Sequence, residues 1–177
     1  DNMAVDSSAI STEYKSVLLG LVKLMRPKQW VKNGFVLAPL VFSGLFTDMA
    51  HVADVLSAML LFCMASSATY VVNDYHDIEH DRKHPVKSKK RPLASGQVSK
   101  PQALALLGVL YGTLVLGYFQ QPSVIMVILA YLSLNLAYTL VLKHQPVIDI
   151  FTIAIGFVLR VYAGAMALSV PVSSWMF

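Results

Sequence analysis

The stretch from residue 73 to residue 81, NDYHDIEHD, holds three aspartates whose spacing suits a metal site. Each residue of an α-helix turns by about 100°, so Asp74, Asp77 and Asp81 would cover about 60° of arc. Three carboxylates on one face repel each other unless water or a cation lies between them. Oxygen donors suit Mg²⁺ or Mn²⁺, and Mg²⁺ prefers one or two carboxylates together with phosphates. The spacing therefore predicts a Mg²⁺–diphosphate site in which these aspartates are the metal ligands and the catalytic residues, with Asn73 beside them.

Two simpler interpretations of this stretch stay open. The first is a solvated loop at a helix end, and the second is a metal stripe formed by His76, His80 and His84, which recur every four residues. The histidines lie on a different face from the aspartates, and loop solvation explains them. Two observations favour the aspartate site: carboxylates are unfavourable at a helix C-terminus, and a row of basic residues follows them directly.

The composition of the chain indicates the elements that position this stretch. Of 177 residues, 56% are hydrophobic and only 14% are charged, whereas a soluble domain has about a quarter charged residues. The chain is therefore predicted to be an integral membrane protein, without a nucleic-acid partner. The single cysteine, Cys63, excludes a disulfide framework and a cysteine-based zinc site.

Four apolar runs approach the length of about 20 residues that a membrane-spanning helix needs. They cover residues 51–73, 102–119, 123–142 and 147–168. A fifth run, 34–46, is shorter and contains Pro39, so we expect it to continue a helix that begins near Ser16 and to form a kinked or broken first span. Residues 1–12 are interpreted as a polar tail or as residues added in cloning. The fold class predicted is an all-α membrane bundle.

The basic residues orient the bundle. With five spans, thirteen of the fourteen lysines and arginines fall on one side of the membrane, which places the N-terminus and the Asp-rich and basic loop 73–100 in the cytoplasm. The fourteenth, Arg160, lies within the last span. A charge at that depth costs several kcal/mol unless it faces the protein interior. We expect it to face a cavity, with a substrate phosphate, an aspartate on another helix or a structural ion pair as its partner.

Three segments resemble a known family. NDYHDIEHD (73–81) fits the NDxxDxxxD motif of the UbiA-type intramembrane prenyltransferase superfamily, and KRPLASG (90–96) resembles its RPLxSG element. RPKQWVKN (26–33) and the segment 138–165 resemble, more narrowly, the branch that transfers phosphoribose to a polyprenyl phosphate. The resemblance covers residues 20–177.

The resemblance implies about nine transmembrane helices around a central cavity, of which five are present here. Residues 13–177 are thus expected to be the N-terminal part of a single transmembrane domain. It also implies a Mg²⁺-dependent transferase in a bacterial inner membrane, with phosphoribosyl diphosphate, a polyprenyl phosphate and membrane lipids as partners. A homo-oligomer is compatible with the sequence.

No GxxxxGK[ST] phosphate loop is present, so side chains must hold the phosphates that the resemblance implies. The candidate substrate-binding residues are Asn73, Lys28, Gln29, Lys32, Asn33, Lys87, Arg91, Tyr138, Lys143 and Arg160. The alternative for the lysines is topological anchoring. Two other functions stay open: a prenyltransferase with a prenyl diphosphate donor and an aromatic or other acceptor, and a non-enzymatic cation-binding or assembly fragment.

Overall fold

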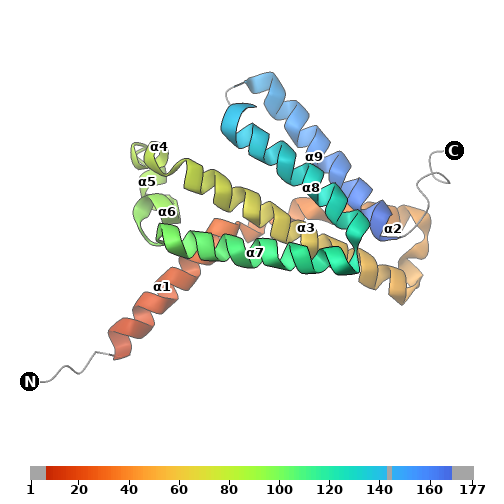
Figure 1. Ribbon diagram of the computed structural model, residues 1–177, viewed down its shortest axis with the longest axis horizontal. Helices are drawn as coiled ribbons and strands as arrows, with labels where there is room; N and C mark the ends of the chain where they lie inside the picture. The colour runs from red at the N-terminus through yellow and green to blue at the C-terminus, as the bar shows by residue number, and fades with distance from the viewer. Residues whose placement is uncertain (1–6, 143–144, 169–177) are drawn as a thin grey trace, which may run out of the picture.

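The computed structural model describes residues 7–142 and 145–168, and every regular element in these ranges is helical (Figure 1). The elements are α1 (Ser7–Met25), the 3₁₀ segment η1 (Pro27–Leu37), α2 (Ala38–Ser43), η2 (Leu45–Thr47), α3 (Met49–His76), α4 (Ile78–Arg82), α5 (Lys87–Lys90), α6 (Pro92–Ser95), α7 (Lys100–Gln120), α8 (Pro122–Ala137), the π-helical η3 (Tyr138–Leu142) and α9 (Pro146–Ala167).

Four helices are long and apolar enough to cross a membrane: α3, α7, α8 continued to Val141, and α9. They coincide with the four predicted apolar runs, and the all-α membrane bundle is confirmed. Large apolar side chains on their outer faces are exposed, including Leu116, Met126 and Phe151. Such faces are suited to contact with lipid. The protein is a multi-pass membrane protein.

The segment predicted to form a first span is not among the four long apolar helices, and it is broken, as predicted. Arg26 ends α1 in the left-handed conformation, with φ 49° and ψ 63°, and the chain then continues through η1, α2 and η2 instead of a single α-helix. Pro27 begins η1 and Pro39 lies in the first turn of α2. Gly44 follows α2 at φ 75°, a value that glycine adopts without a Cβ clash.

The start of the first helix differs from the prediction. Helix α1 begins at Ser7 and not near Ser16, so residues 7–12, set aside as a polar tail, belong to it. The hydroxyls of Ser11 and Thr12 both donate to the Ser8 carbonyl. A solvated first turn needs no apolar face, so the hydrophobic pattern gave no signal there. Figure 1 shows α1 extending away from the bundle.

The helix starts in the bundle have recognisable caps. Asp48 accepts a hydrogen bond from the backbone N–H of Ala50 and begins α3, while Ser99 and Gln102 form a reciprocal capping box at α7. A hydrogen bond from His51 lowers the pKa of the Asp48 carboxyl. Pro101, Pro122 and Pro146 lie in the first turns of α7, α8 and α9, where proline is favoured.

Two apolar clusters hold the helices together. The larger one surrounds Phe62 on α3 and joins it to α2, α7, α8 and α9; the smaller one joins Leu24 of α1 to α3, α6 and α7. At one point α9 lies directly against η1, because a Cβ on Gly164 would overlap the carbonyl oxygen of Val36. The end of the bundle where α3 ends and α7 begins, connected through α4, α5 and α6, is called the charged end below (Figure 1).

Candidate active site

Asp74 lies in the last turn of α3 and is held by two arginines from other elements. Arg26 donates from Nη2 to Asp74 Oδ1 at 2.6 Å, and Arg91 donates from Nη1 to the same oxygen at 2.9 Å. The Asp74 side chain is 2% exposed, whereas the guanidinium-bearing side chains are 26% and 27% exposed. A carboxylate this deeply buried needs partners, since an unpaired buried charge costs several kcal/mol. Three separate segments of the chain therefore meet at Asp74.

Arg26 was not among the predicted site residues. It was considered only as one of the basic residues that set the topology, although it begins the RPKQWVKN segment. Its guanidinium also lies over the ring of Tyr70, 4.7 Å from the ring centroid. A non-glycine residue in the left-handed conformation costs about 1–2 kcal/mol, and strain of this kind concentrates at functional sites. The Arg–Pro pair directly after an apolar helix was the available signal.

The other two aspartates lie at a kink in the helix and after it. The backbone N–H of Asp77 donates to the Asn73 carbonyl, and the N–H of Asp81 donates to the Asp77 carbonyl, as in a continuous helix. The ψ of 10° at Asp77 nevertheless bends the chain there. Asp81 is 3% exposed and faces inward like Asp74. Asp77 is 19% exposed and lies 3.0 Å from His76 Nδ1. The expected stripe is thus kept for Asp74 and Asp81, while Asp77 lies closer to solvent.

The chemistry of the donors fits a hard divalent cation, but the three carboxylates do not form a ready-made cage. Among the described residues no group of three or more His, Cys, Asp or Glu side chains is placed to hold a metal ion. Oδ1 of Asp74 already accepts two guanidinium groups. Such a donor set suits Mg²⁺ in the form in which proteins usually bind it, with substrate phosphates completing the coordination.

The histidine stripe is not supported as a metal site. His84 Nδ1 accepts the backbone N–H groups of Val86 and Lys87, both at 3.1 Å, and so stabilises the turn before α5. His80 is exposed on α4.

The predicted phosphate-binding residues come from η1 and α5. Lys28 and Lys32 are exposed on η1, Gln29 lies between them, and Lys87 is half-buried on α5. The position of Lys143 lies outside the described residues. No contact in the structure assigns a ligand to these side chains, and their roles stay predictions.

Arg160 is buried among neutral partners. Its side chain is 6% exposed, its Nε donates to Asn33 Oδ1 at 2.8 Å, and its Nη2 donates to the Tyr131 hydroxyl at 3.4 Å. The guanidinium lies 5.1–5.5 Å from the ring centroids of Phe62, Tyr131 and Phe157. Within residues 7–142 and 145–168, Arg160 forms no salt bridge. Two of the partners predicted for it, an aspartate on another helix and a structural ion pair, are therefore absent from these residues.

Asn33, predicted to contact substrate, is completely buried and holds Arg160 in place. Its Oδ1 accepts from Arg160 and from Ser66 Oγ, and its Nδ2 contacts the Cys63 sulfur at 3.3 Å. In this structure both polar atoms of the Asn33 side chain contact protein groups, and none of its surface is exposed to a substrate.

A cavity of about 160 Å³ opens between η1, α3, α8 and α9. The charged residues that line it are Lys32, Asp149 and Arg160, together with Tyr70, Tyr131, Asn135 and Tyr138. Tyr138, predicted as a possible substrate contact, lines this cavity together with Asp149. Arg160 faces this cavity, as we expected from its depth in the last span.

Trp30 connects η1 to α3. Its indole Nε1 donates to Ser67 Oγ at 2.8 Å, and Ser67 Oγ donates to the carbonyl of Met25 at 2.9 Å. Met25 directly precedes Arg26. The indole is therefore connected through Ser67 to the residue next to the strained turn.

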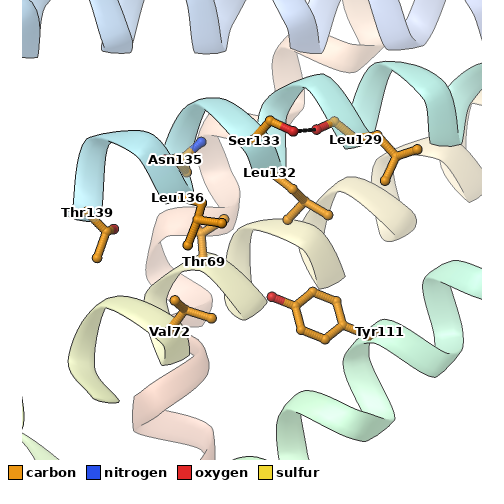
Figure 2. Close-up of a pocket in the computed structure, with 9 residues that line it drawn as sticks. All are labelled: Thr69, Val72, Tyr111, Leu129, Leu132, Ser133, Asn135, Leu136 and Thr139. Atoms are coloured by element: carbon orange, nitrogen blue, oxygen red, sulfur yellow. Dashed lines mark hydrogen bonds between the residues drawn. The ribbon is translucent and has the colours of Figure 1, made fainter. Parts of the chain in front are cut away.

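A second cavity, of about 150 Å³, lies on the other side of α8 and is bordered by α3 and α7 (Figure 2). It contains no acidic or basic side chain, and its wall combines leucines and a valine with Tyr111 and a few hydroxyl groups. Ser133 donates to the Leu129 carbonyl of its own helix, as Figure 2 shows. None of the charged candidate residues borders this cavity, although Asn135 lines both.

Comparison with known proteins identifies the family to which the chain belongs. The model of the UbiA prenyltransferase family matches residues 36–177. The chain is 40% identical to a decaprenyl-phosphate phosphoribosyltransferase of Mycolicibacterium smegmatis over 98% of its own length and 56% of the relative. It is 38% identical to the protein of the same name from Corynebacterium glutamicum, over 91% of the chain and 50% of the relative. It is 31% identical to the nodulation protein NoeC of Azorhizobium caulinodans, over 83% of the chain and 48% of the relative.

The chain therefore spans about half the length of the curated relatives it matches. The family match covers most of the chain and includes Asp74, Asp77, Asp81, Arg91 and Arg160. UbiA family prenyltransferases are generally dependent on divalent metals. The four membrane-spanning helices, the acidic and basic residues at their charged end and this match lead to one conclusion: the chain belongs to the UbiA prenyltransferase family.

Proposed function

We propose that the protein transfers 5-phosphoribose from phosphoribosyl diphosphate to a polyprenyl phosphate within a membrane. The observation that supports this most directly is the convergence of Arg26 and Arg91 on Asp74, beside the buried Asp81. Carboxylates and guanidinium groups thus lie together at one point of a membrane bundle, which supports a site for a cation and phosphates. Two relatives named decaprenyl-phosphate phosphoribosyltransferase support the choice of substrates.

The proposed reaction needs no covalent protein intermediate. A phosphate oxygen of the polyprenyl phosphate attacks the anomeric carbon, and a new C–O bond forms. The bond between that carbon and the diphosphate breaks, and diphosphate leaves with the electron pair. The attacking oxygen is already anionic, so no general base is required. The sugar carbon becomes cation-like and the leaving group gains charge, and electrostatic stabilisation of the leaving group is the main task of the protein.

The residues at the charged end match this task. Mg²⁺ held by Asp74, Asp77 and Asp81 would neutralise charge on the leaving diphosphate. Arg91 and Arg26 would then exchange Asp74 for phosphate oxygens, which the planar guanidinium binds with two parallel hydrogen bonds. Lys28, Lys87 and Lys143 would surround the same phosphates. Asn73 would orient a neighbouring carboxylate or the donor.

The proposed location is a bacterial inner membrane, with the charged end in the cytoplasm. The basic residues support this orientation through the positive-inside rule. A water-soluble donor would arrive from that side, and the lipid acceptor would enter from the bilayer.

The description of the family supports one alternative function: prenyl transfer from a prenyl diphosphate donor to an aromatic or other acceptor. To separate the two, the purified protein receives Mg²⁺ with either phosphoribosyl diphosphate and a polyprenyl phosphate, or prenyl diphosphate and an aromatic acceptor. We expect product only in the first mixture and its loss with a chelator. Turnover only in the second mixture would overturn the proposal.

A further inference from the structure

The cavity between η1, α3, α8 and α9 presents a cation that the described chain does not neutralise. Arg160 is nearly buried there, and an amide oxygen, a hydroxyl and three aromatic rings surround it. Ring faces and amide oxygens stabilise a guanidinium without removing its charge. Nε and Nη2 make the protein hydrogen bonds, which leaves Nη1 for a ligand. Lys32 adds a second cation to the wall.

The same cavity holds a hydrogen-bond acceptor without a donor. Oδ1 of Asp149 is buried and has no hydrogen-bond partner in the described part of the chain. A buried carboxylate oxygen in this situation is costly unless a ligand or water donates to it. Sugar hydroxyls are donors of this kind.

The spacing between the two charges fits a small sugar phosphate. The guanidinium of Arg160 reaches back along α9, because a Cβ on Gly156 would lie 3.0 Å from its Nη1. Gly156 is seven residues from Asp149, which corresponds to about 10 Å along the helix. A cavity of about 150 Å³ accommodates a single ring, and this one has about 160 Å³. It has room for one ribose ring.

We infer that this cavity binds the 5-phosphoribosyl half of the donor, with Asp149 accepting a ribose hydroxyl and Lys32 and Arg160 binding the 5-phosphate. The inference rests on the proposed function and adds a second site to the charged cluster around Asp74. Gly156 leaves the space for the guanidinium, and Asn33 is a positioning residue that acts through Arg160. Residues from η1 and α9 would thus bind the sugar phosphate, while Asp74 and Arg91 would act on the diphosphate.

The chemistry that Lys32 and Arg160 recognise is a phosphomonoester, and the lipid acceptor carries one as well. The orphaned Asp149 oxygen favours the sugar, because a polyprenyl phosphate offers no hydroxyl group to it. The two sources are distinguished by testing each ligand separately.

The test uses ribose 5-phosphate, which contains the sugar half of the donor and lacks the diphosphate. Its dissociation constant is measured by equilibrium binding to the purified full-length protein, next to those of phosphoribosyl diphosphate and a short polyprenyl phosphate. We expect ribose 5-phosphate to bind without Mg²⁺. Lys32→Gln, Arg160→Gln and Asp149→Asn should each weaken it roughly tenfold, the effect of losing one charge-assisted hydrogen bond. Arg160→Lys should restore part of the loss.

Two controls keep the outcomes separate. Lys100→Gln removes an exposed cation outside both sites and should change no dissociation constant. Lys32 is also exposed, so its variant tests the site even if a change at the buried Arg160 unfolds the protein. If the wild type binds no phosphoribosyl diphosphate, the proposed function fails. If it binds this donor while the Lys32 and Asp149 variants match the control, or weaken only polyprenyl phosphate, the sugar site is refuted and the proposed function stands.

Discussion

Asp74 and Arg160 are two buried charges that the protein stabilises in different ways. Asp74 is paired with two guanidinium groups, so its neighbourhood has little unsatisfied negative charge. Arg160 is surrounded by an amide, a hydroxyl and rings, so its positive charge remains. An anion can bind at Arg160 without displacing a protein carboxylate. At Asp74, a cation would bind a carboxylate whose Oδ1 already accepts two guanidinium groups.

Asparagine substitutions should therefore distinguish the role of Asp74 from that of Asp77. Asp74→Asn leaves two arginines without their carboxylate and should lower stability by roughly 1–3 kcal/mol, between the values for exposed and buried pairs. Asp77→Asn should abolish transfer while leaving the melting temperature nearly unchanged, because Asp77 is closer to solvent. Thermal unfolding in detergent and product formation measure the two effects. A collapse of the fold in Asp77→Asn would make that residue structural.

The left-handed backbone at Arg26 makes a second prediction at this scale. Arg26→Ala and Arg26→Gly both remove the ion pair with Asp74, but only the alanine keeps a Cβ at φ 49°. The glycine variant should be more stable than the alanine variant by about 1 kcal/mol. Chemical denaturation of both variants compares them directly. Equal stability would mean that the backbone at this position carries no strain.

The sequence was informative for side chains that lie within one motif and poor for those brought together by folding. Asp74 and Arg91 are 17 positions apart and belong to neighbouring motifs. The Asn33–Arg160 contact joins residues 127 positions apart, and the Arg26–Asp74 contact depends on a left-handed turn. Neither spacing nor composition contains that information. Arg160 was placed in a cavity because its depth alone makes any other position costly.

At the scale of the elements, α9 sets the geometry of the site through two glycines. Gly164 brings α9 against the backbone of η1, and Gly156 gives space to the Arg160 guanidinium. Both features hold Lys32 of η1 and Asp149 of α9 on the same cavity.

Gly164→Ala should destabilise the protein by about 1–3 kcal/mol, because its Cβ would overlap the Val36 carbonyl and overpacking is costly. Gly108→Ala is the matched control: it lies in the middle of α7 with no atom within 4 Å of an added Cβ. That change should leave stability unchanged or raise it by up to about 1 kcal/mol. Thermal unfolding of both variants in the same detergent is the measurement. A similar loss in both would refute the close approach of α9 to η1.

The long elements could be predicted and the short ones could not. Apolar runs predicted α3, α7, α8 and α9, because a membrane demands continuous apolar helices. The kink at Asp77 and the short helices α4–α6 have no hydrophobic pattern, since their polar side chains are solvated. The break of the first crossing was predicted from Pro39, but its 3₁₀ geometry was not.

At the scale of the whole molecule, the charges and the apolar surface give the bundle a direction. Lysines and arginines gather at the charged end, while the outer faces of α7, α8 and α9 expose apolar side chains. The only cysteine in the chain, Cys63, is buried and provides an unreactive background for labelling.

The orientation predicts how single added cysteines react. Lys83→Cys, in the loop of the charged end, should react with a membrane-impermeant maleimide only after the cells are opened. Gln120→Cys, at the opposite end of α7, should react in intact cells whose outer membrane has been removed. Both positions are exposed, so accessibility within the protein is the same for each. The reverse pattern would invert the proposed topology.

The indole of Trp30 is tied through Ser67 to the peptide unit just before Arg26. The protein thereby carries a native fluorophore close to the turn that, under the proposed function, would relax when a ligand draws Arg26 away from Asp74. The second tryptophan of the chain, Trp175, can be replaced by phenylalanine to leave a single emitter. Titration with substrate would then report the opening of the turn as a change in emission wavelength, in real time and without any attached dye.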